Sequence, residues 1–215
     1  MTREVEALIQ LVSHHDPDHP DAAWQAAIAL GEREYTDPED RVSALTALLA
    51  VLRPPAHALT RAHAAEALGK LGDRRAVEAL MRALNDGYYL VRAYAAGSLG
   101  QLGDERAVAS LIQVLTRDTF FGARAAAATA IGRLCRGSAS APCQQAMEVL
   151  RSQRIKDESS GDERSWRVLE EIDRALGRAI PPNQSGAMSC LRVIAEVERA
   201  IRRIGGDVDE SSQGG

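Results

Sequence analysis

The sequence predicts an all-α solenoid, in which antiparallel helix pairs stack side by side. An internal repeat is the first reason: Arg61–Asp73 recurs as Arg92–Asp104 after 31 residues, and a third copy opens at Arg124, 32 residues later. A fixed period of this size is typical of repeat architectures. The composition is the second reason, because only 4% of the residues are aromatic and alanine is abundant. Small side chains let helix axes approach, whereas strands favour β-branched and aromatic residues.

Each repeat is predicted to hold two amphipathic helices joined by a tight turn. In the first copy, the apolar residues of the first helix share one face at helical spacing: Ala64, Ala65, Leu68 and Leu71. Gly72 is expected to end this helix, and the Asp73 carboxylate to cap the next one. The second helix has its own apolar stripe, formed by Val77, Leu80, Met81 and Leu84. Neither helix can bury its stripe alone, so successive repeats must stack.

The repeats divide the chain into three predicted parts. Residues 1–155 form the solenoid, with a degenerate repeat at about 20–53 and regular repeats at about 57–152. Residues 156–204 form a C-terminal helical part that either caps the solenoid or docks a partner. Within it we expect a polar loop at 156–162 and helices at 163–179 and 187–204. Residues 205–215 are expected to form a disordered tail.

The charge pattern gives no support for a nucleic-acid partner. The net charge is −4; residues 1–59 carry 4 basic and 10 acidic groups, whereas residues 60–135 carry 10 basic and 7 acidic groups. The mildly basic centre indicates either solvated helix faces or a groove that accepts carboxylates. The charged N-terminus lacks the pattern of a signal peptide, and no apolar run has the length of a membrane span. We therefore expect a cytoplasmic protein without a membrane span.

The cysteines are expected to be ordinary thiols. They are odd in number and include no C-x-x-C pair, so a disulfide framework is not expected: Cys135, Cys143 and Cys190. The alternative is that Cys135 and Cys143 bind a metal or cluster.

The sequence assigns no catalytic residue and no metal site. Three histidines lie among aspartates and prolines near the N-terminus, at His14, His15 and His19. Imidazole and carboxylate groups bind metals, but a surface loop is the expected structure for this stretch and a metal site the alternative. No Gly-rich phosphate loop, G-x-S-x-G motif or H-E-x-x-H motif is present.

Two turns that begin successive repeats carry matching acidic, aromatic and basic residues. They are Asp86, Tyr88, Tyr89 and Arg92 at the first turn, and Asp118, Phe120, Phe121 and Arg124 at the second. Aromatic rings beside arginines can contact a partner or stack on a flat conjugated ligand. Aspartates can accept hydrogen bonds from pyrrole N–H groups, and guanidinium groups can pair with propionates. His63 and Tyr94 share the third position of their first helices and complete the candidate set.

A structural role for the same residues is the alternative. Arginine–aspartate pairs would set the stacking of the repeats, and the rings would fill gaps between turns of a small-residue core.

Two sequence blocks have a distinctive form: Ala67-Leu-Gly-Lys-Leu-Gly-Asp73 and Ser98-Leu-Gly-Gln-Leu-Gly-Asp104, each followed by Ala-Val and a Leu-rich helix. They resemble HEAT-like repeats, in particular those named after phycobilisome lyases. The segments Tyr88–Arg92 and Phe120–Arg124 are similar to repeat starts in that family. The resemblance covers roughly residues 22–152.

This resemblance implies a protein similar to the E/F-type phycobilin lyases. Those lyases attach a linear tetrapyrrole to a cysteine of an apo-phycobiliprotein through a thioether bond, often as a heterodimer of two related subunits. Relatives detach bilins or act as chaperones. The implied partners are a phycobiliprotein subunit and a second repeat subunit, and the implied bilin is a substrate rather than a permanently bound cofactor. A non-catalytic scaffold or chaperone is the alternative function, and an iron–sulfur or metal accessory protein is a third.

Overall fold

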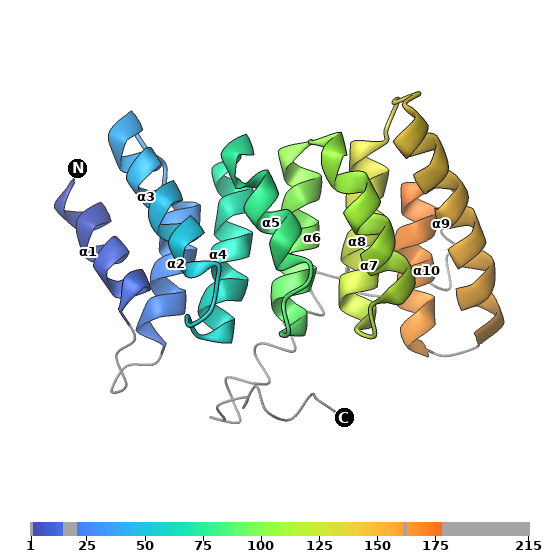
Figure 1. Cartoon of the computed structure of the whole chain (residues 1–215), viewed down its shortest axis with the longest axis horizontal. Helices are drawn as coiled ribbons and strands as arrows, with labels where there is room; N and C mark the ends of the chain where they lie inside the picture. The colour runs from blue at the N-terminus through green and yellow to red at the C-terminus, as the bar shows by residue number, and fades with distance from the viewer. Residues whose placement is uncertain (1, 15–20, 161–162, 178–215) are drawn as a thin grey trace. The chain divides into compact units, whose positions relative to one another are not determined.

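The computed structural model describes residues 2–14, 21–160 and 163–177, which form ten α-helices and two 3-10 turns with no strand among them (Figure 1). The predicted all-α solenoid of helix pairs is confirmed. The chain divides into two compact units. The N-terminal unit comprises residues up to Asp86 together with Leu90–Asp104, and the C-terminal unit comprises Gly87–Tyr89 and the residues from Glu105 onward.

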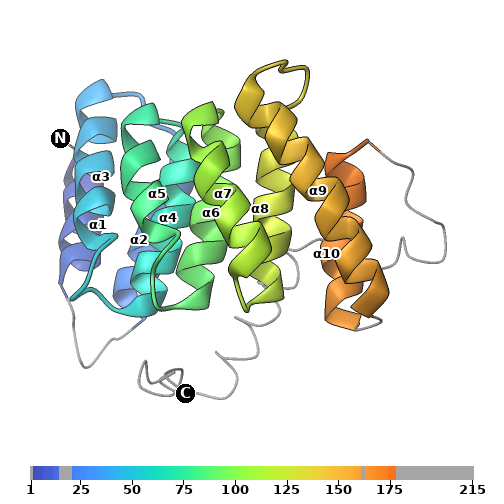
Figure 2. The ribbon, with the colours of Figure 1, turned by 45° about the vertical axis from the view of Figure 1, so that its right-hand side comes forward.

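The N-terminal unit is built from successive helix pairs. Its helices are α1 (Arg3–Ser13), α2 (Ala22–Glu32), α3 (Pro38–Val51), α4 (Ala58–Leu71), α5 (Val77–Ala83) and α6 (Tyr89–Leu102, whose first residue belongs to the C-terminal unit), with the 3-10 turn η1 (Arg74–Ala76) before α5. The first helices of successive pairs, α2, α4 and α6, form one layer, and α3 and α5 lie in a second (Figure 2). Leucines form the core between the layers: Leu30, Leu48, Leu68, Leu80 and Leu99 are fully buried.

The turn between α4 and α5 has the predicted form. Gly72 ends α4 with a left-handed φ of 69°, which glycine adopts without steric cost. The Asp73 carboxylate then accepts a hydrogen bond from the backbone N–H of Arg75 at 2.9 Å. Hydrogen bonds from the Arg75 side chain lower the pKa of Asp73 to about 2, although partial burial acts in the opposite direction.

At two successive junctions, one arginine connects a helix pair to the pair that follows. Arg41 Nη2 donates to the carbonyl oxygen of Leu71 at 2.6 Å, and Arg74 Nη2 donates to that of Gly103 at 2.8 Å. Both carbonyls lie at the C-terminal end of a first helix, where backbone acceptors have no partner within the helix. The separations of 30 and 29 residues follow the repeat period, so the same device is used twice.

Small residues set the distance between neighbouring first helices. A Cβ atom at Gly31 of α2 would lie 2.6 Å from the Ala67 Cα atom of α4. A Cβ atom at Gly69 of α4 would lie 2.4 Å from the Ser98 hydroxyl of α6, which itself donates to the carbonyl oxygen of Ala65 at 2.8 Å. The helices can approach this closely only because these positions lack a side chain.

The C-terminal unit continues the pattern. It contains η2 (Glu105–Ala107), α7 (Val108–Arg117), α8 (Phe121–Leu134), α9 (Ala141–Ser160) and α10 (Glu163–Ala175). Gly132 of α8 faces Ala175 of α10 as closely as Gly31 faces Ala67. The Thr129 hydroxyl donates to Glu171 at 2.6 Å. Helix α10 thus packs on α8 as the first helix of a further repeat would.

One expectation about the C-terminal part of the chain is wrong, and others concern residues that the structure does not describe. Helix α9 runs to Ser160, so most of the loop expected at 156–162 is helical. Arg154, in the C-terminal half of α9, forms an ion pair with Asp173 of α10 at 2.6 Å. This ion pair anchors the extended end of α9 to α10. The helix expected at 187–204 and the tail at 205–215 lie outside the described residues, as do His15 and His19.

The expectation that all cysteines are free thiols is wrong. Cys135 and Cys143 form a disulfide, with their Cα atoms 5.1 Å apart. Cys135 is the residue after α8 and Cys143 lies in the first turn of α9, so the connection between these two helices brings the sulfurs together. The spacing of the two cysteines in the sequence does not predict this disulfide, because it forms only when the connection between α8 and α9 reverses the chain direction. Cys190 lies outside the described residues.

We predict opposite effects for two glycine-to-alanine changes. Gly31→Ala should lower the free energy of unfolding by about 1–3 kcal/mol, because its Cβ would overlap the α4 backbone. The control is Gly97→Ala in α6, where a Cβ atom meets nothing within 4 Å. This change should raise stability by up to about 1 kcal/mol through helix propensity. Urea unfolding of both variants checks the pair, and equal effects would contradict the close-approach interpretation.

The disulfide gives a second prediction. Cys143→Ser should lower the free energy of unfolding by about 2 kcal/mol, because the bond closes a short loop between α8 and α9. Chemical denaturation with and without dithiothreitol measures the effect, and the reductant should change the wild type but not the variant. Thiol titration of the denatured, unreduced protein should find one free thiol; three would rule out the bond.

Candidate binding residues

The ten residues singled out from the sequence fall into two groups. Four belong to the N-terminal unit: His63, Asp86, Arg92 and Tyr94. Six belong to the C-terminal unit: Tyr88, Tyr89, Asp118, Phe120, Phe121 and Arg124.

Asp86 is engaged in a buried ion pair. Arg61 Nε and Nη2 donate to its two carboxylate oxygens, both at 2.9 Å, and the two side chains are only 5% and 8% exposed. Arg61 Nη1 donates in addition to the carbonyl oxygen of Ala56 at 2.5 Å. A bidentate pair of this kind fixes both groups. The sequence could have indicated a role for Arg61, because Arg61 has the same position in its repeat as the candidate residue Arg92 has in the next one.

The arginine six residues after each aspartate bonds to the backbone. Arg92 Nη1 donates to the carbonyl oxygen of Asp86 at 3.0 Å, and Arg124 Nη1 donates to that of Asp118 at 3.1 Å. The Asp118 carboxylate accepts from the backbone N–H of Phe120 at 2.8 Å, just before α8 begins. These bonds close the turns, so each aspartate–arginine spacing has a structural function at the start of a first helix.

His63 and Tyr94 belong to a buried ring stack. The His63 ring lies 5.3 Å from the Trp24 ring and 5.7 Å from the Tyr94 ring, so that α2, α4 and α6 each contribute one ring. All three side chains are buried. His63 Nδ1 lies 3.4 Å from a carboxylate oxygen of Glu66. Burial acts to raise the pKa of Glu66, but hydrogen bonds from His63 and Lys70 outweigh it and the pKa lies below its usual value.

Four aromatic side chains of the C-terminal unit form a continuous row. Ring centroids are 4.8 Å apart for Tyr88 and Tyr89, 4.5 Å for Tyr89 and Phe120, and 5.1 Å for Phe120 and Phe121. Tyr88 is buried and the other three are half-buried. We call these four residues the aromatic row. The structure thus brings together the two aromatic pairs that the sequence placed at equivalent turns.

Two further residues shape the aromatic row. The Arg167 guanidinium of α10 lies 5.9 Å from the Phe121 ring centroid, a cation–π distance. A Cβ atom at Gly122 would lie 2.5 Å from the Phe120 ring, so the ring occupies this position only because Gly122 lacks a side chain. Sequence analysis missed Arg167 because its helix, α10, carries no copy of the repeat motif. The row offers half-exposed ring faces ending at a cation, which suits contact with an aromatic or anionic partner.

Metal chemistry finds no support in the part of the chain that the structure describes. Within residues 2–14, 21–160 and 163–177, no group of three or more His, Cys, Asp or Glu side chains could hold a metal ion. No described helix is both long and apolar enough to cross a membrane.

Comparison with known proteins assigns the repeats. Residues 45–132 match the family model for HEAT repeats. This part of the chain is therefore similar to HEAT repeats. The matched region contains both complete repeats, Arg61–Leu84 and Arg92–Leu115, and ends at Gly132 within the third copy recognised from the sequence. No curated protein matches this sequence.

Two solved structures have a fold similar to that of this chain. The complex of CpcE and CpcF of phycocyanin lyase from Nostoc sp. PCC7120 matches with a TM-score of 0.55 and 24% identity, over 81% of this chain and 66% of that chain. An engineered protein matches with a TM-score of 0.57 and 20% identity, over 97% of this chain and 91% of that chain. At these identities the likeness establishes the fold alone, and the predicted resemblance to HEAT-like repeats is confirmed by the family match.

The buried ion pair generates a test of its structural role. Asp86→Ala should lower the free energy of unfolding by about 3–5 kcal/mol, because it leaves the Arg61 guanidinium buried without its carboxylate. Arg61→Met with Asp86→Leu should recover much of this loss, since no unpaired charge remains. Exposed Glu78→Ala is the control and should stay within about 0.5 kcal/mol of the wild type. Additive losses for the single and double variants would show that the pair is not coupled.

Proposed function

We propose that this protein is a phycobilin lyase-related HEAT-repeat protein. It binds an apo-phycobiliprotein, together with a linear tetrapyrrole, and assists chromophore attachment or subunit maturation. The likeness to the phycocyanin lyase complex over 81% of the chain is the observation that carries this proposal. The lyase-type repeat starts at Tyr88–Arg92 and Phe120–Arg124 support it.

The aromatic row is the surface that we assign to the partner or the bilin. Tyr89, Phe120 and Phe121 keep part of each ring exposed, and Arg167 adds a positive charge at the Phe121 end. Ring faces of this kind can stack on a conjugated ligand or receive an aromatic side chain, while a guanidinium can pair with a propionate. Asp86 is already held by Arg61 and is therefore assigned to the scaffold rather than to the ligand.

In this function the partner supplies the reacting thiol. The resemblance implies a thioether bond between the bilin and a cysteine of the phycobiliprotein, so the sulfur belongs to the substrate. The role of the HEAT repeats is to hold the two reactants in one orientation, which can lower the barrier without a catalytic side chain. By analogy with the two-subunit CpcE–CpcF complex, we propose a second repeat subunit as an additional partner.

A non-catalytic scaffold or chaperone is the second candidate. The observation that favours it is the number of structural bonds made by the polar residues of the two turns. Asp86 binds Arg61, the Asp118 carboxylate binds the Phe120 N–H group, and Arg92 and Arg124 bind backbone carbonyls. Residues used in this way hold a surface in shape, which is the common role of repeat proteins.

Co-expression with apo-phycobiliprotein subunits and bilin-producing enzymes tests the proposal. The full-length protein should co-purify with one subunit and increase the amount of coloured covalent adduct. Phe121→Ala should reduce recovery of the complex about tenfold, because it removes an exposed ring from the aromatic row. Tyr35→Ala is the matched control, a half-exposed aromatic in the N-terminal unit, and should behave as the wild type.

The outcomes separate the two candidates. A stable complex that forms without bilin and yields no extra coloured adduct would favour the chaperone. Failure to bind any phycobiliprotein subunit, with the fold intact by circular dichroism, would refute both.

A further inference from the structure

Gly122, in the first turn of α8, is buried and lies against the Phe120 ring. If residue 122 had a Cβ atom, the three nearest atoms would all belong to this ring, at 2.5, 2.7 and 3.3 Å. Carbon atoms in favourable contact are about 3.5–4.0 Å apart, so a side chain at this position and the ring cannot occupy the same space. The place of the Phe120 ring therefore depends on Gly122.

The backbone of Phe120 is fixed from both sides. Its N–H group donates to the Asp118 carboxylate at 2.8 Å. Its carbonyl oxygen accepts from the backbone N–H groups of Ala123 and Arg124 at 3.0 and 3.2 Å, at the start of α8. Because these hydrogen bonds hold the backbone, the ring is the part of Phe120 that can move, and the space beside Gly122 decides where it rests.

The equivalent turn of the preceding repeat has a different arrangement. With the 32-residue offset between these repeats, Tyr88 aligns with Phe120 and Leu90 aligns with Gly122. Leu90 is fully buried, and Tyr88 is only 5% exposed. Phe120, in contrast, is half-buried. A partly exposed ring thus occurs at the turn where glycine replaces the leucine.

The Phe120 ring connects the two halves of the aromatic row. Its centroid lies 4.5 Å from that of Tyr89 and 5.1 Å from that of Phe121. Tyr89 and Phe121 belong to different helices, α6 and α8. The position of this one ring therefore determines whether the row is continuous.

We propose that Gly122 is the positioning residue of the aromatic row. It acts through Phe120: the missing side chain sets the Phe120 ring against Tyr89, so that the half-exposed rings form one surface before a partner binds. A surface that is ordered in advance loses less side-chain freedom on binding. This inference rests on the function proposed for the row and adds the residue that gives the row its shape.

Gly122→Ala should displace the ring without weakening the fold. The added methyl group would meet the end of a side chain, which can rotate, whereas at Gly31 it would meet the backbone of α4. The midpoint of urea unfolding should therefore equal that of the wild type. Nuclear Overhauser effects between the ring protons of Tyr89 and Phe120 should be present in the full-length wild type and lost in the variant.

Binding of an apo-phycobiliprotein subunit supplies the second measurement. Gly122→Ala should weaken binding about tenfold, because the row is no longer continuous. Gly97→Ala is the matched control, a helical glycine whose added Cβ atom meets nothing within 4 Å, and should bind as the wild type does. In a Phe120→Ala background, Gly122→Ala should have no further effect, because the ring through which it acts is absent.

Three results would overturn the inference: a Tyr89–Phe120 contact that persists in Gly122→Ala, a lower urea midpoint of this variant, or an additive loss of binding in the double variant. Failure of the wild type to bind any phycobiliprotein subunit would refute the proposed function. The ring contact and the unfolding midpoint would then still decide whether Gly122 positions the row.

Discussion

Neighbouring first helices approach each other closely, and this short spacing governs the other packing features of the protein. At Gly31, Gly69 and Gly132 the facing helix lies within van der Waals contact of the backbone, so each of these positions excludes a side chain. The same spacing recurs in both units. Because the first helices are this close, their alanines and leucines form a buried apolar core. Polar groups at the helix ends must then find hydrogen-bond partners in the adjacent repeat.

Those partners are supplied by arginines, which have long side chains and several donors. Arg41 and Arg74 bind carbonyl groups at the ends of first helices, and Arg61 pairs with the largely buried Asp86 carboxylate. The stacking of the repeats is therefore defined by directional bonds as well as by apolar burial. A similar role falls to Glu171 and Asp173 in the C-terminal unit, where they fix α10 against α8 and α9.

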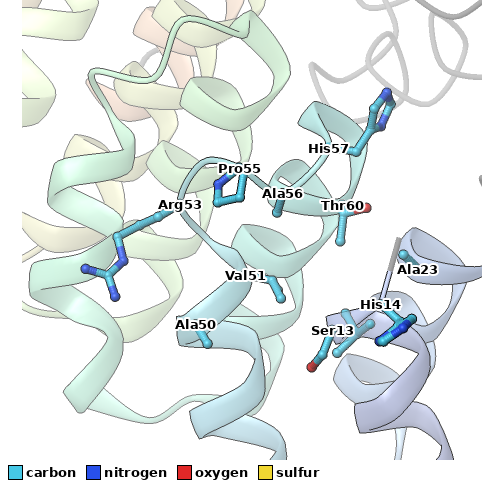
Figure 3. A pocket seen from close by; sticks show the side chains of 11 residues that line it. Ser13, His14, Ala23, Ala50, Val51, Arg53, Pro55, Ala56, His57 and Thr60 are labelled. Atoms are coloured by element: carbon cyan, nitrogen blue, oxygen red, sulfur yellow. The ribbon is translucent and has the colours of Figure 1, made fainter. Parts of the chain in front are cut away.

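This packing leaves two different surfaces partly exposed. The aromatic row is partly exposed and ends at Arg167, which suits a large partner or a flat ligand. A pocket of the N-terminal unit, lined by Val12, Ala23 and Val51, is open to solvent (Figure 3), because Ser13, His14 and Arg53 in its wall are exposed. Both surfaces lie at the ends of helices. In a closely packed repeat array the helix faces are buried against neighbouring repeats, whereas side chains at the turns remain partly exposed.

The fold class, the helix pairs, the glycine and aspartate of the repeat turn, and the equivalence of the two aromatic turns could all be predicted from the sequence. Repetition made these features visible, because each recurs at the same offset. The partners of the side chains became known from the packing of the helices. This packing placed His63 and Tyr94 in the interior, gave Asp86 to Arg61, joined Cys135 to Cys143, and set Arg167 against Phe121. These pairings join residues from different turns or different helices, and their distances depend on how the helices pack, which a linear period does not specify.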